Sequence, residues 1–328
     1  MLALALAVVL SGTPPEKTEA FREQMGEALR RHDGGDFAGA ISIYRSMLAT
    51  WPHHPAVVYE LSLSMAANRT PPDELIAFVE GELKAMKKPE PILYATLASA
   101  LDARGDLAKG EAALRTGLKL DPRSGDLHFN LGINLAMQKR SKDALPEFAK
   151  ATELMPAWPS AWRATSIAFE QNGQRVEALL ARSRFVLLEP DGERSLDAAL
   201  TLEPLLTAGI DDDGKKMTLN VGNTEDLALM LVVTAALTED KDKKQTPGAR
   251  FVSAMRHTIE FLAEKPTGFR AHALQAFLDA KKQNCLDAAL WELRRALHDP
   301  DADTWFAAHA DEEARFTKFA KALRKPVP

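Results

Sequence analysis

Three prolines recur along this chain at a constant spacing. Pro122, Pro156 and Pro190 lie 34 residues apart, twice in succession, and each follows a segment whose apolar residues return every three or four positions. That periodicity is typical of amphipathic helices, and proline cannot continue a helix. A period of 34 residues accommodates two helices and their turns, so the spacing predicts a chain of stacked helix pairs.

Small residues occupy a second constant position, twelve residues before each proline. They are Gly110, Ala144 and Ala178. A small side chain at a crossing point lets two helices approach closely enough to interdigitate. A few residues further upstream lie dipeptides that we interpret as the tight turns inside each pair: Gly105-Asp106, Lys139-Arg140 and Gly173-Gln174.

The clearest repeat spans residues 125–158. Its first helix carries Leu131-Gly132 and Leu135, and its second helix carries Ala144, Phe148, Ala151 and finally Pro156. In these positions the sequence resembles the tetratricopeptide repeat family, whose 34-residue unit is a helix–turn–helix. The resemblance implies an all-α fold, a right-handed solenoid of paired helices with a concave groove lined by the first helix of each pair.

The resemblance is clear over residues 91–192 and weaker at 21–90 and 267–300. It predicts a repeat array of about five units over 17–192, followed by a divergent helical region over 193–328 with a late repeat at 267–300. The distance from Pro52 to Pro89 is 37 residues, so we expect about three inserted residues near 69–72.

The divergent region is also expected to be mostly helical. The pattern predicts helices over 195–208 and from 224 to about 237, and then a charged loop over 239–248 that leads to another helix through 262. The composition of 216–221 permits a short strand there. Residues 304–323 contain Trp305, Phe316 and Phe319 and are expected to cover the last apolar face, because a solenoid needs a terminal cap.

The N-terminal residues 1–13 form a separate segment. An apolar run over 2–10 is followed by Ser11, Gly12 and Thr13, which is the outline of a secretory signal cut after Ser11. No Lys or Arg precedes the run, and the alternative is an apolar terminus that packs on the first helices. We expect export, to a bacterial periplasm; without a functional signal the chain would be cytoplasmic.

Composition excludes several classes of function. Lys and Arg number 41 against 46 Asp and Glu, and a net charge of −5 argues against nucleic acid as a partner. No apolar run approaches the roughly 20 residues that a membrane span needs. One cysteine, Cys285, excludes an internal disulfide or a multi-cysteine zinc site.

Motifs of catalysis and cofactor binding are missing from the sequence. It contains no phosphate-binding glycine loop, nucleophile elbow or zinc-binding His-Glu-x-x-His. The acidic run 211–213 before Gly214 fails as a calcium loop, because Gly209 and Asn220 stand where ligands are needed. We therefore expect no cofactor, no metal and no enzymatic activity. The alternative is an accessory or enzyme-like protein of the cell envelope with an unrecognised site in 191–265.

The predicted groove offers the candidate functional site. Positions that point away from the paired helix carry more large apolar groups than a solvated face requires, and such surfaces usually mark a partner site. The residues we expect to contact a partner protein or peptide are Tyr59, Leu63, Phe129, Asn130, Ile133, Arg163 and Ile167. The alternatives are that they pack between adjacent first helices, or that the groove accepts the chain's own N-terminal segment. The sequence leaves the partner's identity and the oligomeric state open.

Overall fold

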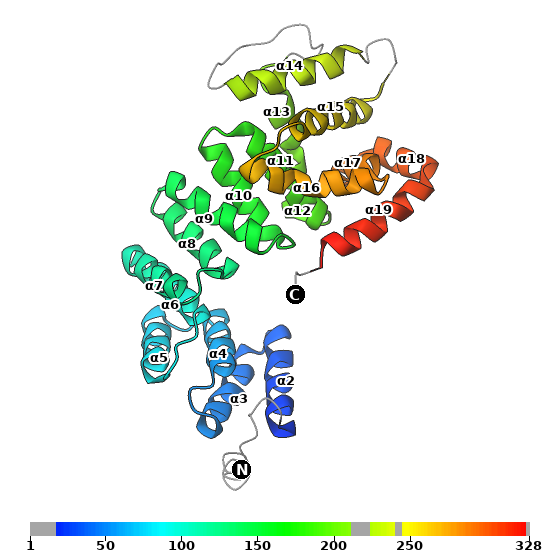
Figure 1. The fold of residues 1–328 in the computed structure, drawn as a ribbon. Coiled ribbons are helices and arrows are strands. Elements are labelled where there is room, and N and C mark those ends of the chain that lie inside the picture. Colours follow the sequence, from blue (N-terminus) through cyan, green and yellow to red (C-terminus); the bar gives the residue numbers. More distant parts are fainter. Residues whose placement is uncertain (1–17, 211–223, 240–244, 326–328) are drawn as a thin grey trace. The chain divides into compact units, whose positions relative to one another are not determined.

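The computed structural model describes residues 18–210, 224–239 and 245–325, and in these ranges the ordered elements are α-helices joined by turns (Figure 1). Two compact units divide the chain, Met1–Arg140 and Ser141–Pro328. The expected all-α fold class and its tetratricopeptide-like helix pairs are confirmed in these residues. Each unit is described by itself below.

The first unit is a succession of antiparallel helix pairs. Each helix packs on its neighbours in sequence, so that α2 contacts α3, α3 contacts α4, and so on to α8. The helices are α2 (Glu19–Asp33), α3 (Phe37–Thr50), α4 (Pro55–Ala67), α5 (Pro72–Ala85), α6 (Ile92–Arg104), α7 (Leu107–Leu120) and α8 (Gly125–Met137).

The turn between α6 and α7 shows why the sequence positions are so constrained. Gly105 has a φ of +95°, a left-handed conformation that glycine adopts without steric cost. Gly110 then faces α6, where an added Cβ would overlap the Oδ1 atom of Asp102. That oxygen accepts a hydrogen bond from Asn134 Nδ2 at 2.6 Å. The small residue therefore makes room for a polar link between α6 and α8.

The inserted residues between Pro52 and Pro89 lie mostly elsewhere than expected. The turn at 68–71 is one residue longer than the three-residue turn at 138–140, whereas the connection at 86–91 has six residues against four at 121–124. Two of the three extra residues therefore follow α5. The prediction that all of them lie near 69–72 is wrong, because prolines downstream of α5 also hold the chain out of helical geometry.

The second unit is built around one central helix. Twelve of the 14 residues of α11 are buried, and α11 contacts α10, α12, α13, α14, α16, α17 and α19. The helices of this unit are α9 (Ser141–Leu154), α10 (Pro159–Gln171), α11 (Arg175–Leu188), α12 (Glu193–Leu200), α13 (Leu202–Thr207), α14 (Thr224–Glu239), α15 (Pro247–Ala263), α16 (Gly268–Lys282), α17 (Leu286–Arg295), α18 (Pro300–Ala308) and α19 (Ala310–Leu323).

One predicted helix of this unit is divided, and the predicted cap consists of parts of two helices. The segment 195–208 forms α12 and α13 with a break at Thr201, because Pro204 has no N–H to donate to the carbonyl four residues earlier. The segment 304–323 belongs to α18 and α19, which separate at His309. Phe316 and Phe319 of α19 are buried, as a terminal cap requires. Residues 267–300 contain the helix pair α16 and α17.

Three predictions lie outside the described residues: the N-terminal signal over 1–13, the acidic turn at 211–213 and the strand at 216–221. They stay predictions. Among the helices that are described, none combines the length and the apolar character that crossing a membrane demands.

Candidate binding groove

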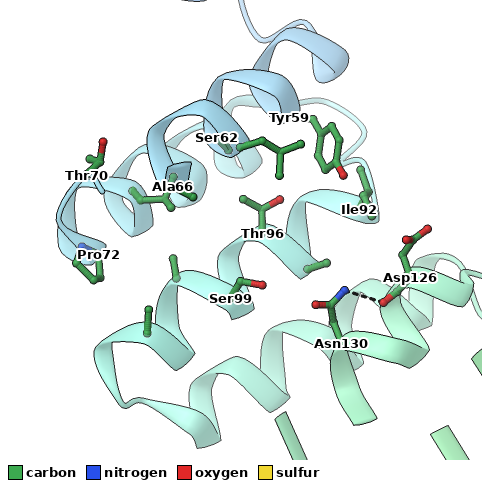
Figure 2. A pocket seen from close by; sticks show the side chains of 15 residues that line it. Tyr59, Ser62, Ala66, Thr70, Pro72, Ile92, Thr96, Ser99, Asp126 and Asn130 are labelled. Carbon is green, nitrogen blue, oxygen red and sulfur yellow. Dashed lines mark hydrogen bonds between the residues drawn. The ribbon is translucent and has the colours of Figure 1, made fainter. Parts of the chain in front are cut away.

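A groove opens between the first helices of the second and third pairs. It has a volume of about 280 Å³ and runs between α4 and α6, with the first turn of α8 at one end (Figure 2). The side chains that line it are those of Tyr59, Ser62, Leu63, Ala66, Thr70, Pro72, Leu75, Ile92, Ala95, Thr96, Ser99, Ala100, Ala103, Asp126 and Asn130.

Helical periodicity brings these side chains to one surface. Tyr59, Leu63 and Ala66 are spaced four and three residues apart on α4, so they share a face of that helix. On α6 the facing positions hold small residues, among them Ala95 and Ser99. Small side chains on both helices, among them Ala66 of α4 and Ser99 of α6, leave space between the helices unfilled.

The two ends of the groove differ in polarity. Figure 2 shows Tyr59 and Asp126 near one end and Thr70 near the other. Among the described residues that line the groove, Asp126 is the only charged one. Burial raises the pKa of its carboxyl above the ordinary range, and no described Lys, Arg or His forms an ion pair with it. Asn130 Nδ2 donates to the backbone oxygen of Asp126 at 2.8 Å.

The hydroxyl of Tyr59 lies in the same negatively charged environment. Burial raises the pKa of its hydroxyl, and the charges of Asp126 and Glu60 raise it further. Burial also raises the pKa of the half-buried Glu60 carboxyl, with His32 acting in the opposite direction and Asp33 in the same one. One end of the groove therefore combines the Tyr59 phenol with the partly desolvated Asp126 carboxyl, and Glu60 lies outside the lining.

The predicted partner-contact residues divide into three groups. Tyr59, Leu63 and Asn130 line the groove. Phe129 and Ile133 lie on α8 but outside this lining; Phe129 is half-buried and Ile133 is 36% exposed.

Arg163 and Ile167 belong to α10 in the second unit. Arg163 is half-buried, and Ile167 is 37% exposed. Their role in contacting a partner stays a prediction. Sequence reasoning missed Asp126, although its position four residues before Asn130 on a helix is a usable signal, because residues at that spacing share a face.

A second hollow of about 470 Å³ lies in the second unit, between residues 190–196 and 292–298. Its lining includes the buried Glu292, whose Oε2 atom has no hydrogen-bond partner among the described residues. Burial raises the pKa of this carboxyl, against the opposing charges of Arg295 and Arg324. Those two arginines approach it at 3.8 and 3.9 Å. The lining thus holds a loose ionic cluster within the fold.

Other titratable groups serve local structure. His257 Nδ1 donates to the Ser253 carbonyl at 2.8 Å, and His309 stacks on Trp305 with ring centroids 4.2 Å apart. Cys285 is buried at the start of α17, and burial raises the pKa of its thiol. In the described part of the chain, no three His, Cys, Asp or Glu residues gather as a metal site would require.

Comparison with known protein families finds no match, and no curated protein matches the sequence. Solved structures do match. MamA is 20% identical with a TM-score of 0.41, over 50% of this chain and 94% of that one. YrrB, described as a TPR protein with an unusual peptide-binding site, is 18% identical with a TM-score of 0.40, over 55% and 90%. TTC0263, a thermophilic TPR protein of Thermus thermophilus, is 16% identical with a TM-score of 0.47, over 56% and 98%.

At this level of similarity the conclusions about fold rest on the chain's own helices and repeat positions. By those criteria the described helix pairs have a tetratricopeptide-like repeat fold.

Proposed function

We propose that this protein is a non-catalytic interaction scaffold that binds a segment of another protein in the groove between α4 and α6. The observation that carries the proposal is the groove itself. Its walls are helix faces on which exposed or half-buried residues, among them Tyr59, Leu63 and Ser99, border buried ones.

The groove lies between two helix faces and has a volume of about 280 Å³. Grooves between helices commonly accept apolar side chains of a helical or extended segment, anchored at a few positions. The groove walls offer one aromatic ring at Tyr59 and one branched aliphatic chain at Leu63 for such anchoring.

The chemistry of the lining also favours binding over catalysis. The described lining includes no His, Cys, Lys or Arg, and none of its described hydroxyls donates a hydrogen bond to the Asp126 carboxylate. The alternative of an enzyme-like envelope protein with a site in 191–265 is less well supported. The hollow beside residues 190–196 places Glu292 among arginines, and Arg295 also bonds Glu313 at 2.9 Å, as a structural ion network does.

A blocking variant tests the proposal. Peptides of about 12 residues selected from a random display library on the full-length protein supply the probe. Ser99 is exposed on α6 and lines the groove, so Ser99→Trp fills the groove without disturbing the core. We expect at least about tenfold weaker binding of the selected peptides. Ala112→Trp, on the exposed face of α7, is the matched control and should bind like the wild type. Equal binding by Ser99→Trp would contradict the proposal.

For localisation we propose export, on the basis of the apolar run at residues 2–10 and the small residues that follow it. Expression of the full chain in a bacterial host and N-terminal sequencing of the purified protein test this. A mature chain that starts at Gly12 supports the proposal, and a retained apolar run contradicts it.

A further inference from the structure

The groove has a charge asymmetry that the proposed function leaves unexplained. Asp126, the one charged side chain among its described lining residues, stands at one end beside Tyr59 (Figure 2). The opposite end is formed by neutral residues, among them Ala66, Thr70 and Pro72. A ligand that lies along the groove therefore meets a negative charge at one end only.

Asp126 has a local structural role that does not account for its state. It lies in the first turn of α8, where the partial positive charge of the helix terminus stabilises a carboxylate and lowers its pKa. The pKa is nevertheless raised, and burial is the leading cause. Burial therefore raises the pKa of this carboxyl by more than the helix terminus and the hydrogen bond from its own backbone N–H lower it.

The opposite charge that would compensate Asp126 is not supplied by the described part of this unit. No described basic side chain pairs with it, and the described groove lining contains no Lys or Arg. Glu60 on α4 lies outside the lining, but its charge acts on the same Tyr59 hydroxyl. The half-buried Asp126 carboxyl, with no ion pair to a described residue, favours a positively charged ligand group at this end.

Polar atoms at the same end of the groove can orient a positively charged ligand group. The Nδ2 atom of Asn130 donates a hydrogen bond to the Asp126 backbone oxygen (Figure 2). The Oδ1 atom of Asn130 can therefore accept a hydrogen bond from a ligand. The Tyr59 hydroxyl can donate to a peptide carbonyl. Beyond them, Leu63 and Ala95 offer apolar contact.

We propose that the groove selects a partner segment in which a Lys or Arg residue adjoins apolar residues, with the cation at Asp126 and the apolar side chains between α4 and α6. This inference rests on the proposed function and adds its specificity. An acidic segment, or one that presents a C-terminal carboxylate at this end, would be repelled, because like charges at an interface oppose binding.

The test compares selected peptides and their charge variants on the full-length protein. Random peptides of about 12 residues are selected on the wild type, and a synthetic binder is compared with its Lys→Gln or Arg→Gln variant by calorimetry. We expect enrichment of a basic residue beside apolar ones, and about tenfold weaker binding after the charge is removed. Asp126→Asn should abolish this difference, whereas Asp126→Glu should keep it. A higher salt concentration should weaken binding of the basic peptide more than binding of its neutral variant.

Glu80→Gln is the control for overall charge, since Glu80 is exposed on α5 and outside the groove. It should leave the preference unchanged. If wild type and Asp126→Asn discriminate the charged and neutral peptides equally, or if selection shows no basic enrichment, the inference is wrong. In either case the proposed function survives when Ser99→Trp still blocks binding. If Ser99→Trp also binds normally, both proposals fail.

Discussion

Helix α6 of the first unit and helix α11 of the second differ in how far along the chain their contacting helices lie. Helix α6 contacts α4, α5, α7 and α8, all within two helices of it in the chain. Helix α11 also contacts α16, α17 and α19. Arg324, which follows the last helix, donates two hydrogen bonds to the Leu187 carbonyl, at 3.2 and 3.0 Å, across 137 residues of sequence. The first unit is a local stack, and the second is closed by segments distant in sequence.

That difference explains where a groove can remain open. In the second unit, Phe269 and His272 of α16 pack on Trp162 and Phe169 of α10, with Phe269 and Phe169 centroids 4.5 Å apart. In the first unit, the first helices α4 and α6 keep their groove-facing side chains available. The same repeat therefore provides a binding surface where it is only stacked, and a core where later helices return to cover it.

The largest expected effect comes from the core of the closed unit. Phe185 of α11 is fully buried, so Phe185→Ala should cost about 3–5 kcal/mol of unfolding free energy. Because α11 contacts helices throughout its unit, hydrogen exchange should accelerate from α10 to α19. Leu114→Ala, at a fully buried position of α7, is the matched variant in the stack. Its effect on exchange should be concentrated in α6 to α8. If faster exchange extended equally far from both substitutions, the distinction between a local stack and a closed unit would be wrong.

A polar link inside the stack gives the next effect. Asn134 is buried and donates to Asp102 Oδ1 at 2.6 Å and to the Leu107 carbonyl at 2.9 Å. Asn134→Ala leaves both acceptors without this donor and should cost about 1–3 kcal/mol in chemical denaturation. Asn130→Ala, on the same helix but facing the groove, should change stability much less. A result in which Asn130→Ala costs as much as Asn134→Ala would contradict this assignment.

Substitution of Arg184 should stabilise the protein, whereas the substitutions above destabilise it. This guanidinium is buried over the Trp162 ring at 4.9 Å, its Nε and Nη1 atoms have no hydrogen-bond partner among the described residues, and burial lowers its pKa to about 10. Arg184→Met removes a costly buried charge and keeps apolar volume, so it should stabilise the unit by about 1 kcal/mol despite losing the cation–π contact. The midpoint of thermal unfolding measures this. A clear decrease in the midpoint would show that the charge is better compensated than its contacts indicate.

The smallest effect concerns pH. Burial lowers the pKa of His272, and the charge of Arg184 adds to this, against the Thr152 carbonyl and Glu153. The unfolded chain takes up a proton at its ordinary pKa of about 6.5, before the folded chain does. The unfolding free energy should therefore decrease as the pH falls below about 6.5. His272→Phe, which keeps a ring against Trp162, should reduce that slope. An unchanged slope would assign the pH dependence to other groups.

The sequence predicted the paired helices because proline and small residues recur at the positions where helices end and cross. It did not predict how α16 and α19 return onto α11, since pairing of distant helices leaves no periodic signal. In the groove, Tyr59, Leu63 and Asn130 followed from helical register. Asp126 did not, because an acidic residue in a first turn has an ordinary structural interpretation. Only its neighbours α4 and α6 show that it also borders a groove.

The central claim is that partner binding uses the open groove of the first unit. Hydrogen exchange of the full-length protein, with and without a selected peptide, tests it most directly. We predict that the peptide slows exchange in α4, α6 and the first turn of α8, and that Ser99→Trp removes this protection. Protection confined to residues 141–325, with no change in α4 and α6, would contradict the claim.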